Sequence, residues 1–272
     1  MELVWNHEGV FTGLGESRDF GVVPTWWSVA ARVQFRRGFE GGVLVGLMLI
    51  AEIFHSMQGE GRYTGTPSVF VRTSGCNLRC WFCDTPYTSW KPEGTAWSVE
   101  AILDEVALSH CPHVVLTGGE PMLVPDLVEL AQELSQRGAF ITIETAGTVD
   151  LPVRADLMSI SPKLGNSTPV GDEWATRHDQ RRHAPAVIRR LVRDYDYQLK
   201  FVIDEPTDVA EVDQWLAEFP EVSPEKVYLM PQATTVEALR EKTEWVQNAA
   251  VERGWQFSPR LHVELYGARR GV

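Results

Sequence analysis

From Met48 onward, short apolar runs rich in β-branched residues alternate with longer amphipathic segments. This alternation is typical of a parallel sheet covered by helices, because parallel strands need a crossover long enough to hold a helix. The predicted strands are 49–54, 68–73, 113–117, 140–144, 157–160, 198–203, 227–230 and 261–265. The predicted helices are 98–109, 125–136, 185–195, 208–219 and 236–253, the last starting in a capping box of Thr234 and Glu237. We therefore expect an α/β fold that closes as a barrel or an open barrel.

Two segments depart from this pattern. Residues 1–47 are Gly-rich with scattered Trp and show no sustained period, so we interpret them as an N-terminal extension, poorly ordered or not translated. Met48 then begins the domain proper, 48–272, and is a candidate alternative translation start. Residues 165–183 are polar without a clear period, which predicts an inserted loop.

Composition limits the class of function. A chain of 272 residues with 44% hydrophobic residues can bury a sizeable core. Its formal net charge of −12 disfavours binding to nucleic-acid phosphates or to an anionic membrane, since both need a cationic face. The most apolar run, 43–53, is too short to span a bilayer, and residues 1–30 show no secretory signal. We expect a cytoplasmic protein that acts on a small molecule.

Three of the four cysteines, Cys76, Cys80 and Cys83, follow a predicted strand with the spacing C-x3-C-x2-C. Three thiolates from one loop can bind three irons of a four-iron four-sulfur (4Fe-4S) cluster and leave the fourth iron open, whereas a structural zinc site uses four ligands. The remaining cysteine, Cys111, is interpreted as a small buried residue. A zinc site with Cys111 or His55 as fourth ligand is the alternative. The spacing favours the cluster, in a reducing compartment.

A second motif, Thr117-Gly118-Gly119-Glu120-Pro121, follows the predicted strand 113–117. Together with the cysteine motif it resembles the radical S-adenosylmethionine (SAM) superfamily, over most of residues 48–265. The resemblance implies an abbreviated, partial TIM-type barrel, and SAM bound to the open iron and cleaved to methionine and a 5′-deoxyadenosyl radical. It also implies that Glu120 accepts a hydrogen bond from the SAM amino group. Trp81 and Phe82 would shield the cluster, or else pack in an ordinary core.

Three polar residues bear on the substrate. Gln58 follows the first predicted strand and offers a donor and an acceptor to a heterocycle edge, although a polar turn would explain it equally. Arg72 lies on the same strand face as Phe70, where a charge needs an anion, either a substrate carboxylate or an internal salt bridge. Thr85 offers a hydroxyl oxygen suited to magnesium, but its spacing alone indicates a turn residue.

In order, the motifs EIFHSMQGEG, VFVRTSGCNLRCWFCDT, VVLTGGEP, ETAGT, ISPK and LKFVI resemble the 7-carboxy-7-deazaguanine synthase family over residues 52–203. The resemblance implies a homodimeric lyase of queuosine or deazapurine biosynthesis. It would convert 6-carboxy-5,6,7,8-tetrahydropterin to 7-carboxy-7-deazaguanine with release of ammonia, using SAM, Mg²⁺ and an external electron donor of flavodoxin or ferredoxin type. It places the cluster on Cys76, Cys80 and Cys83; SAM at Phe82, Cys83, Asp84, Gly119, Ser161, Pro162, Lys163, Met230, Pro231, Gln232 and Ala233; substrate at Met57, Gln58, Gly59, Arg72 and Thr117; and magnesium at Thr85.

Three segments depart from the family pattern or stay open. The sequence MPQA at 230–233 has a different order around its proline, and Ala146 in ETAGT replaces an amide side chain. Near the C-terminus, Arg269 or Arg270 could reach the substrate or could belong to a solvated tail.

Two other classes of function remain alternatives. A glycyl-radical activating enzyme shares the cysteine spacing but acts on a partner protein, and QGEG together with Arg72 argues against it. A zinc-stabilised binding module would contain one zinc instead of iron and sulfide. No Ser-His-Asp or paired-carboxylate arrangement stands out, so no catalytic residue is assigned, and His178 and His183 are expected to be solvated.

Overall fold

The computed structural model describes residues 4–5, 11–12, 46–267 and 269–271, and divides the chain into two units, 1–44 and 45–272. In the first unit, β1 (Val4–Trp5) and β2 (Phe11–Thr12) form a short antiparallel pair. The rest of the predicted extension lies almost wholly outside the described residues, so the boundary at residue 48 stays a prediction.

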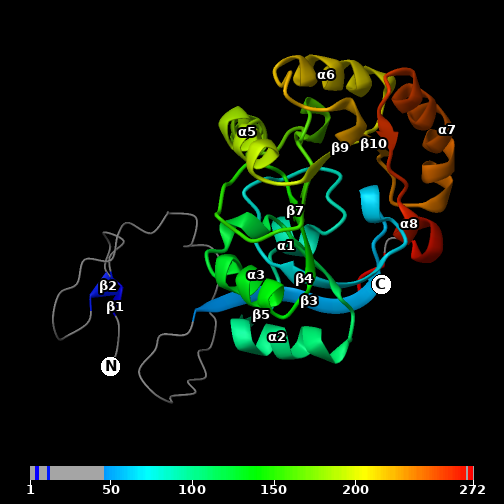
Figure 1. Ribbon diagram of the computed structural model, residues 1–272. Helices are drawn as coiled ribbons and strands as arrows, with labels where there is room; N and C mark the ends of the chain where they lie inside the picture. Colours follow the sequence, from blue (N-terminus) through cyan, green and yellow to red (C-terminus); the bar gives the residue numbers. More distant parts are fainter. Residues whose placement is uncertain (1–3, 6–10, 13–45, 268, 272) are drawn as a thin grey trace. The chain divides into compact units, whose positions relative to one another are not determined.

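In the second unit, nine strands of the described residues form one sheet in the order β11-β10-β9-β8-β7-β6-β4-β3-β5 (Figure 1). All neighbours from β4 to β11 are parallel, and β3 is antiparallel to both β4 and β5. The strands are β3 (Leu47–Met57), β4 (Pro67–Thr73), β5 (Thr95–Ser98), β6 (His113–Gly118), β7 (Phe140–Thr145), β8 (Leu157–Ile160), β9 (Tyr197–Ile203), β10 (Val227–Pro231) and β11 (Gln256–Phe257). Because β5 and β11 are both edges, the barrel is partial, as predicted.

Helices cover the sheet between successive parallel strands. Helix α2 packs on β3 and β5, α3 on β7, α6 on β9, and α7 on β10 and β11. The helices are α1 (Pro86–Ser89), α2 (Val99–Leu108), α3 (Leu127–Gln136), α4 (Ala175–Arg182), α5 (Pro185–Asp194), α6 (Pro206–Ala217), α7 (Val236–Glu252) and α8 (Leu261–Tyr266). The crossovers predicted from the alternating pattern are therefore confirmed.

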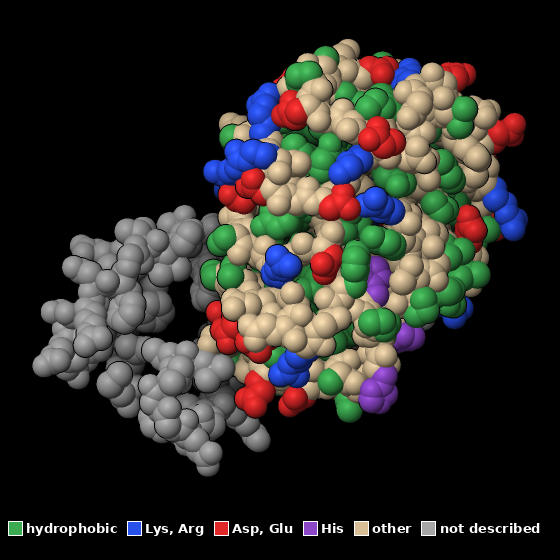
Figure 2. Space-filling model, viewed as in Figure 1, with side chains coloured by type: hydrophobic (Ala, Val, Ile, Leu, Met, Phe, Trp, Pro, Cys, Tyr) green, Lys and Arg blue, Asp and Glu red, His purple; other side chains and the backbone are tan. Residues whose placement is uncertain are grey.

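The central strands are buried on both faces, which explains their continuous apolar runs. Val114, Val115 and Leu116 of β6 are fully buried, as are Ile141 and Ile143 of β7. Polar residues stand at the carboxyl ends of these strands, where Thr117 and Thr145 are buried as well. On the face shown in Figure 2, acidic and basic side chains are interspersed. Among the described residues there is no helix long and apolar enough to cross a membrane.

Three predictions about elements are wrong. The run 261–265 forms α8 instead of a strand, because β11 occupies that sheet edge and Val263 packs with Leu239 and Ala233. A five-residue apolar alternation does not by itself distinguish the two. Residues 165–183 are not a structureless loop, since they contain α4. The N-cap of α7 is Thr235, whose side chain accepts from the Ala238 amide, and not Thr234.

Strands β5 and β11 were not predicted. Both are short edge strands, and β11 has only two residues, so neither shows a clear period in the sequence.

Candidate active site

A cavity of about 490 Å³ lies at the carboxyl ends of the parallel strands. Side chains reach it from the ends of β4, β6, β7, β8, β9 and β10, and from the loops that follow them. This is the edge where α/β barrels place their sites, because the loops of neighbouring parallel strands meet there. The volume is within the range of small-molecule sites.

The cysteine loop lies close against the loop that follows β6. Gly118 has φ +150° and approaches the Thr73 backbone, and a Cβ at Gly119 would lie 2.2 Å from the Gly75 carbonyl oxygen. The Gly119 amide donates to Thr73 O at 3.2 Å, and the Glu120 amide to Gly75 O at 2.9 Å. The two glycines of TGGEP therefore allow the cysteine loop to pack on the end of β6.

All three cysteines of the motif line the cavity, and all are free thiols. Burial raises the pKa of Cys76 to about 12 and that of Cys80 to about 11, so these thiols stay protonated unless a metal replaces the proton. The Cys83 sulfur lies 3.2 Å from Ser89 Oγ. Three convergent thiols, of which Cys80 is buried and Cys76 and Cys83 are partly buried, fit the 4Fe-4S cluster, with the fourth iron left for another ligand.

The zinc alternatives do not have this geometry. The Cys111 sulfur donates to the carbonyl of Pro67, at the start of β4, whereas the cysteine loop follows the other end of that strand. Seven strand residues separate the two sites by roughly 20 Å. His55 is exposed on β3 and does not line the cavity. Neither residue can complete a zinc site with the three thiols.

Most residues predicted to contact SAM line the same cavity as the thiols, although they come from four separate loops. Those that line it are Phe82, Cys83, Asp84, Gly119, Ser161, Lys163, Met230, Gln232 and Ala233. Pro162 and Pro231 do not line it. Lys163 Nζ is bonded to Ser161 O and Oγ, which holds that loop in shape. These residues are placed together; their contacts with SAM stay a prediction.

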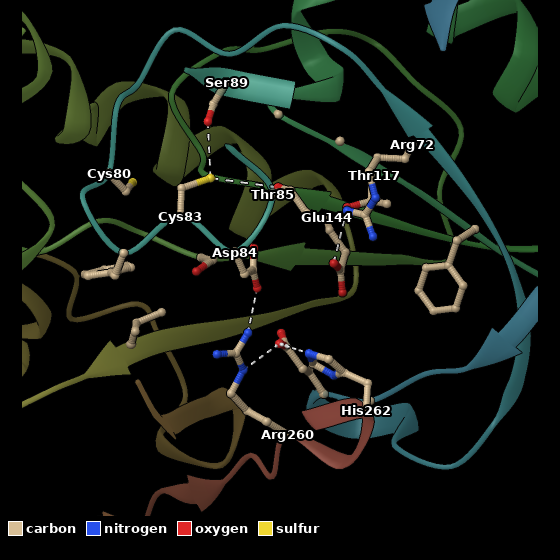
Figure 3. A pocket seen from close by; sticks show the side chains of 18 of the residues that line it. Arg72, Cys80, Cys83, Asp84, Thr85, Ser89, Thr117, Glu144, Arg260 and His262 are labelled. Atoms are coloured by element: carbon tan, nitrogen blue, oxygen red, sulfur yellow. Dashed lines mark hydrogen bonds and ion pairs between the residues drawn. The ribbon is translucent and has the colours of Figure 1, made fainter. Parts of the chain in front are cut away.

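The predicted substrate residues Met57, Gln58, Gly59, Arg72 and Thr117 also line the cavity, as does Thr85. Arg72 faces it together with Phe70, as the strand alternation predicts, and lies near Thr117 and Glu144 in Figure 3. Arg72 Nε is 2.7 Å from Glu52 Oε1, so the internal salt bridge is present. Its guanidinium also lies over the Phe54 ring at 5.6 Å. Glu52 therefore fixes one side of Arg72 beside the cavity.

A charged network, which the sequence did not reveal, forms another wall of the cavity. Lys200 Nζ contacts Glu60 Oε2 at 2.9 Å and Glu144 Oε1 at 3.2 Å. Gln58 Nε2 donates to the same Glu144 oxygen at 3.2 Å, and Thr117 Oγ1 donates to the other at 3.4 Å. Glu60 and Lys200 lie within the motifs QGEG and LKFVI, but nothing in the sequence showed that they pair.

The network continues through Arg260, which bonds Glu60 at 3.3 Å and Asp84 at 2.6 Å (Figure 3). Ligand atoms of Glu60, Asp84 and His262 lie within 4.8 Å of one another, but the Arg260 guanidinium already supplies the compensating charge there. Burial alone would raise the pKa of Glu60, yet Lys200 and Arg260 lower it well below its ordinary value. Burial lowers the pKa of His262, so this imidazole is neutral at neutral pH.

Two expectations for side chains near the cluster are wrong. Glu120 is fully buried and does not line the cavity; it accepts from Thr145 Oγ1 and from the Met122 and Ala146 amides. It therefore holds the ends of β6 and β7 together instead of facing SAM. Trp81 is 52% exposed, so of the two aromatic residues only Phe82 lines the cavity.

His178 is fully buried instead of solvated. It accepts from the Arg79 amide through Nδ1 at 3.0 Å, and its Nε2 lies 2.9 Å from Ser167 Oγ. Since a backbone amide only donates, the proton of the neutral ring is on Nε2. His183 is half-buried and lies 3.1 Å from Glu218.

The C-terminal arginines, Arg269 and Arg270, are exposed and also line the cavity, so a substrate contact and a solvated tail both stay open. Arg270 contacts Glu93 at 2.9 Å and Glu52 at 3.4 Å, and its guanidinium stacks over Tyr87 at 4.2 Å.

The buried His178 predicts a loss of stability in acid. Burial lowers the pKa of His178 to about 4 from an ordinary 6.5. The contribution of this neutral imidazole to the free energy of unfolding is therefore complete above pH 6.5 and is lost as the pH falls toward 4. This linkage removes about 2 kcal/mol between pH 7 and pH 5. Urea unfolding at both pH values measures it, with His178→Asn as control because Asn keeps an acceptor for the Arg79 amide. Equal losses in the two proteins would contradict the assignment.

Comparison with known proteins agrees with this geometry. The family model of the radical SAM superfamily matches residues 70–164, which span the cysteine loop and the glycine loop. The fold and the three-thiol site are those of a radical SAM enzyme, a class that implies a 4Fe-4S cluster and SAM as cofactors.

Relatives define the family within that class. A 7-carboxy-7-deazaguanine synthase from Rhodopirellula baltica is 47% identical over 229 residues, covering 83% of this chain and 89% of the relative. One from Halobacterium salinarum is 48% identical over 230 residues, covering 80% and 90%. The crystal structure of QueE from Escherichia coli matches with a TM-score of 0.60 at 26% identity, covering 79% of this chain and 95% of that one. This chain belongs to the 7-carboxy-7-deazaguanine synthase family.

Proposed function

We propose that the protein converts 6-carboxy-5,6,7,8-tetrahydropterin to 7-carboxy-7-deazaguanine with release of ammonia, in queuosine or other deazapurine biosynthesis. The observation that carries the proposal is a single small cavity that contains both the three thiols and a wall of paired hydrogen-bonding groups. Family membership supports the same reaction. Neither the cavity nor the family membership favours a glycyl-radical activating enzyme, which acts on a partner protein, or a zinc-stabilised binding module.

The charged wall suits the edge of a pterin. Gln58 can donate and accept, Glu144 only accepts, and Lys200 only donates. Lys200 is bonded to both Glu60 and Glu144 and holds the two carboxylates at the cavity wall, where their oxygens can accept from ring N–H and amino groups. The wall would orient the heterocycle by hydrogen bonds, which is positioning rather than acid–base work.

Arg72 is proposed to bind the substrate carboxylate. Glu52 occupies its Nε, and the remaining guanidinium N–H groups are on a side chain that lines the cavity. An arginine held on one side by a carboxylate keeps a fixed fork for a second carboxylate. Arg270 also contacts Glu52, so the C-terminal residues would help to hold this arrangement.

On the other side of the cavity, the cysteine loop would hold the cluster, and the loops after β6, β8 and β10 would hold SAM. When bound, this pair supplies the radical that abstracts a hydrogen from the carbon bearing the carboxylate. Phe82 packs against the thiols and Met230 lines the same cavity, and these two apolar side chains would exclude water from that reaction.

We further propose that Thr85 binds Mg²⁺. Its hydroxyl faces the cavity between Cys83 and Thr117 (Figure 3), and Thr88 Oγ1 donates to it at 3.2 Å, which leaves a lone pair for the metal. Thr85→Val is expected to raise the Mg²⁺ concentration for half-maximal activity by about tenfold or more, whereas Thr85→Ser stays within about twofold. Titration of activity with Mg²⁺ measures this. An unchanged Mg²⁺ requirement in the valine variant would show that Thr85 is not a ligand.

The partners follow from the same function. An external one-electron donor of flavodoxin or ferredoxin type would reduce the cluster, and the protein would act as a homodimer, which light scattering measures. Four free cysteines among the described residues support a reducing compartment such as the cytoplasm.

The test of function uses anaerobically reconstituted protein with SAM, dithionite, Mg²⁺ and 6-carboxytetrahydropterin, followed by mass spectrometry. We expect 7-carboxy-7-deazaguanine in excess over the SAM consumed. If 5′-deoxyadenosine and methionine form while the pterin stays intact, the protein is a radical SAM enzyme with another substrate.

A further inference from the structure

An exposed tryptophan lies inside the loop that carries the cluster cysteines. Trp81 is 52% exposed, although it lies between Cys80 and Phe82 in the sequence. Its Nε1 donates to Asn166 O at 2.7 Å, and its ring packs edge-on against Phe82 at 5.3 Å between centroids. Phe82 in turn lines the cavity with the three thiols. One aromatic side chain thus separates this surface indole from the cluster site.

Arginines surround the same loop. The Arg79 guanidinium lies over the Trp174 ring at 4.2 Å, and that of Arg177 lies over the same ring at 4.6 Å. Arg181 lies four residues after Arg177 on α4, so these two side chains share one face of that helix. We call Arg79, Trp81, Trp174, Arg177 and Arg181 the cysteine-loop patch.

Hydrogen bonds hold the patch residues of α4 against the cysteine loop. His178 of α4 bonds the Arg79 amide and lies 2.9 Å from Ser167, the residue whose carbonyl accepts from the Trp81 amide at 3.2 Å. Helix α4 and the cysteine loop are thus held in one arrangement, which a docking surface requires.

The charge of this patch is not neutralised locally. On the next helix, α5, Arg189, Arg190 and Arg193 each have a carboxylate within 4 Å, namely Glu221, Asp150 and Asp194. In the described part of the chain, neither Arg177 nor Arg181 has such a partner, and the aspartate of α4 is bonded to Arg182. A chain of net charge −12 thus keeps unpaired cations beside its cluster loop.

We propose that the cysteine-loop patch is the docking site of an acidic, flavin-carrying electron-transfer protein of the flavodoxin type, which rests on the proposed function. The unpaired arginines attract an acidic partner and would accelerate encounter. The exposed indole offers a flat aromatic surface on which a flavin ring edge can pack. The reduced flavin gives one electron to the oxidised cluster, whose net charge becomes one unit more negative. The step needs no proton transfer.

The experiment measures the reduction of cluster-loaded protein by photoreduced flavodoxin in anaerobic stopped flow, through bleaching of the cluster absorbance. The test variants are Arg177→Glu/Arg181→Glu and Trp81→Ala. The matched control, Arg189→Glu/Arg190→Glu, makes the same change of net charge on α5. The affinity for oxidised flavodoxin, by calorimetry, is a second readout that does not depend on turnover.

We expect the α4 double variant to lower the second-order rate constant by about tenfold or more and to flatten its dependence on ionic strength. The α5 control is expected to stay within about twofold, and Trp81→Ala to slow reduction at unchanged ionic-strength dependence. Reduction and product formation with dithionite should remain normal, which separates this proposal from the proposed function.

Three results would overturn the docking site. The first is that the α4 variant and its α5 control are reduced by flavodoxin equally slowly. The second is that the α4 variant is reduced more slowly by dithionite to the same extent as by flavodoxin. The third is that the patch variants slow reduction by a two-iron ferredoxin but not by flavodoxin.

Discussion

Cys80→Ala is expected to abolish cluster binding and, with it, all SAM cleavage. Cys80 is the buried member of three thiols in a single loop, and two thiolates do not hold a 4Fe-4S cluster that already lacks a fourth protein ligand. Iron should fall from about four per chain to a background level. Iron and sulfide analysis, with 5′-deoxyadenosine measured after reduction by dithionite, gives the result.

The matched control for this prediction is Cys111→Ala. Cys111 is also a free, partly buried thiol, but it lies at the opposite end of β4. We expect this variant to keep its iron and its SAM cleavage. A Cys80→Ala protein that retained a cluster and cleaved SAM would refute the three-thiol site, whereas loss of iron in both variants would indicate general damage.

Arg72→Ala is expected to keep the cluster and SAM cleavage but to lower kcat/KM for the pterin by about 10²-fold or more. Removing a charged partner from a largely buried carboxylate site costs about 2–5 kcal/mol. The fold should tolerate the change, because Glu52 still accepts from Tyr87 Oη at 2.7 Å and from Arg270. Steady-state kinetics, with 5′-deoxyadenosine formation measured without pterin, separates the two effects.

Two further variants define the role of Arg72. Arg72→Lys keeps the charge but not the fork, so it should recover only part of the loss. Glu52→Gln leaves Arg72 in place but weakens its anchor, so it should raise KM more than it lowers kcat. Normal activity in Arg72→Ala would show that the arginine only pairs with Glu52.

The sequence was sufficient to predict a site whose residues lie close together along the chain. Cys76, Cys80 and Cys83 share one loop, so their spacing predicted the three-thiol site and favoured it over a four-ligand zinc site. The parallel strands were predicted equally well, because a strand buried on both faces reads as an unbroken apolar run between amphipathic helices. Short edge elements failed, since a run such as 261–265 is too short for its period to distinguish a strand from α8.

The side chains that fill the cavity show the opposite case. Glu120 was expected to bind SAM, but the Ala146 and Met122 amides and Thr145 already occupy its carboxylate. His178 was expected to be solvated, but α4 buries it against the cysteine loop. The sequence shows that both residues are polar, but it carries no signal of which groups each one bonds.

The sequence by itself thus determined the fold class and the cluster loop, because local periodicity and spacing encode them, and its ordered motifs carried the resemblance to the family. Only the tertiary structure decided which charges meet around the cavity. Gln58 bonds Glu144 across 86 positions, and Glu60 bonds Arg260 across 200. Gln58 follows the antiparallel strand β3, and β4 and β6 lie between that strand and β7, which carries Glu144. Such pairs form because the partial barrel turns distant strands and loops toward one cavity, and no local pattern records which of them meet there.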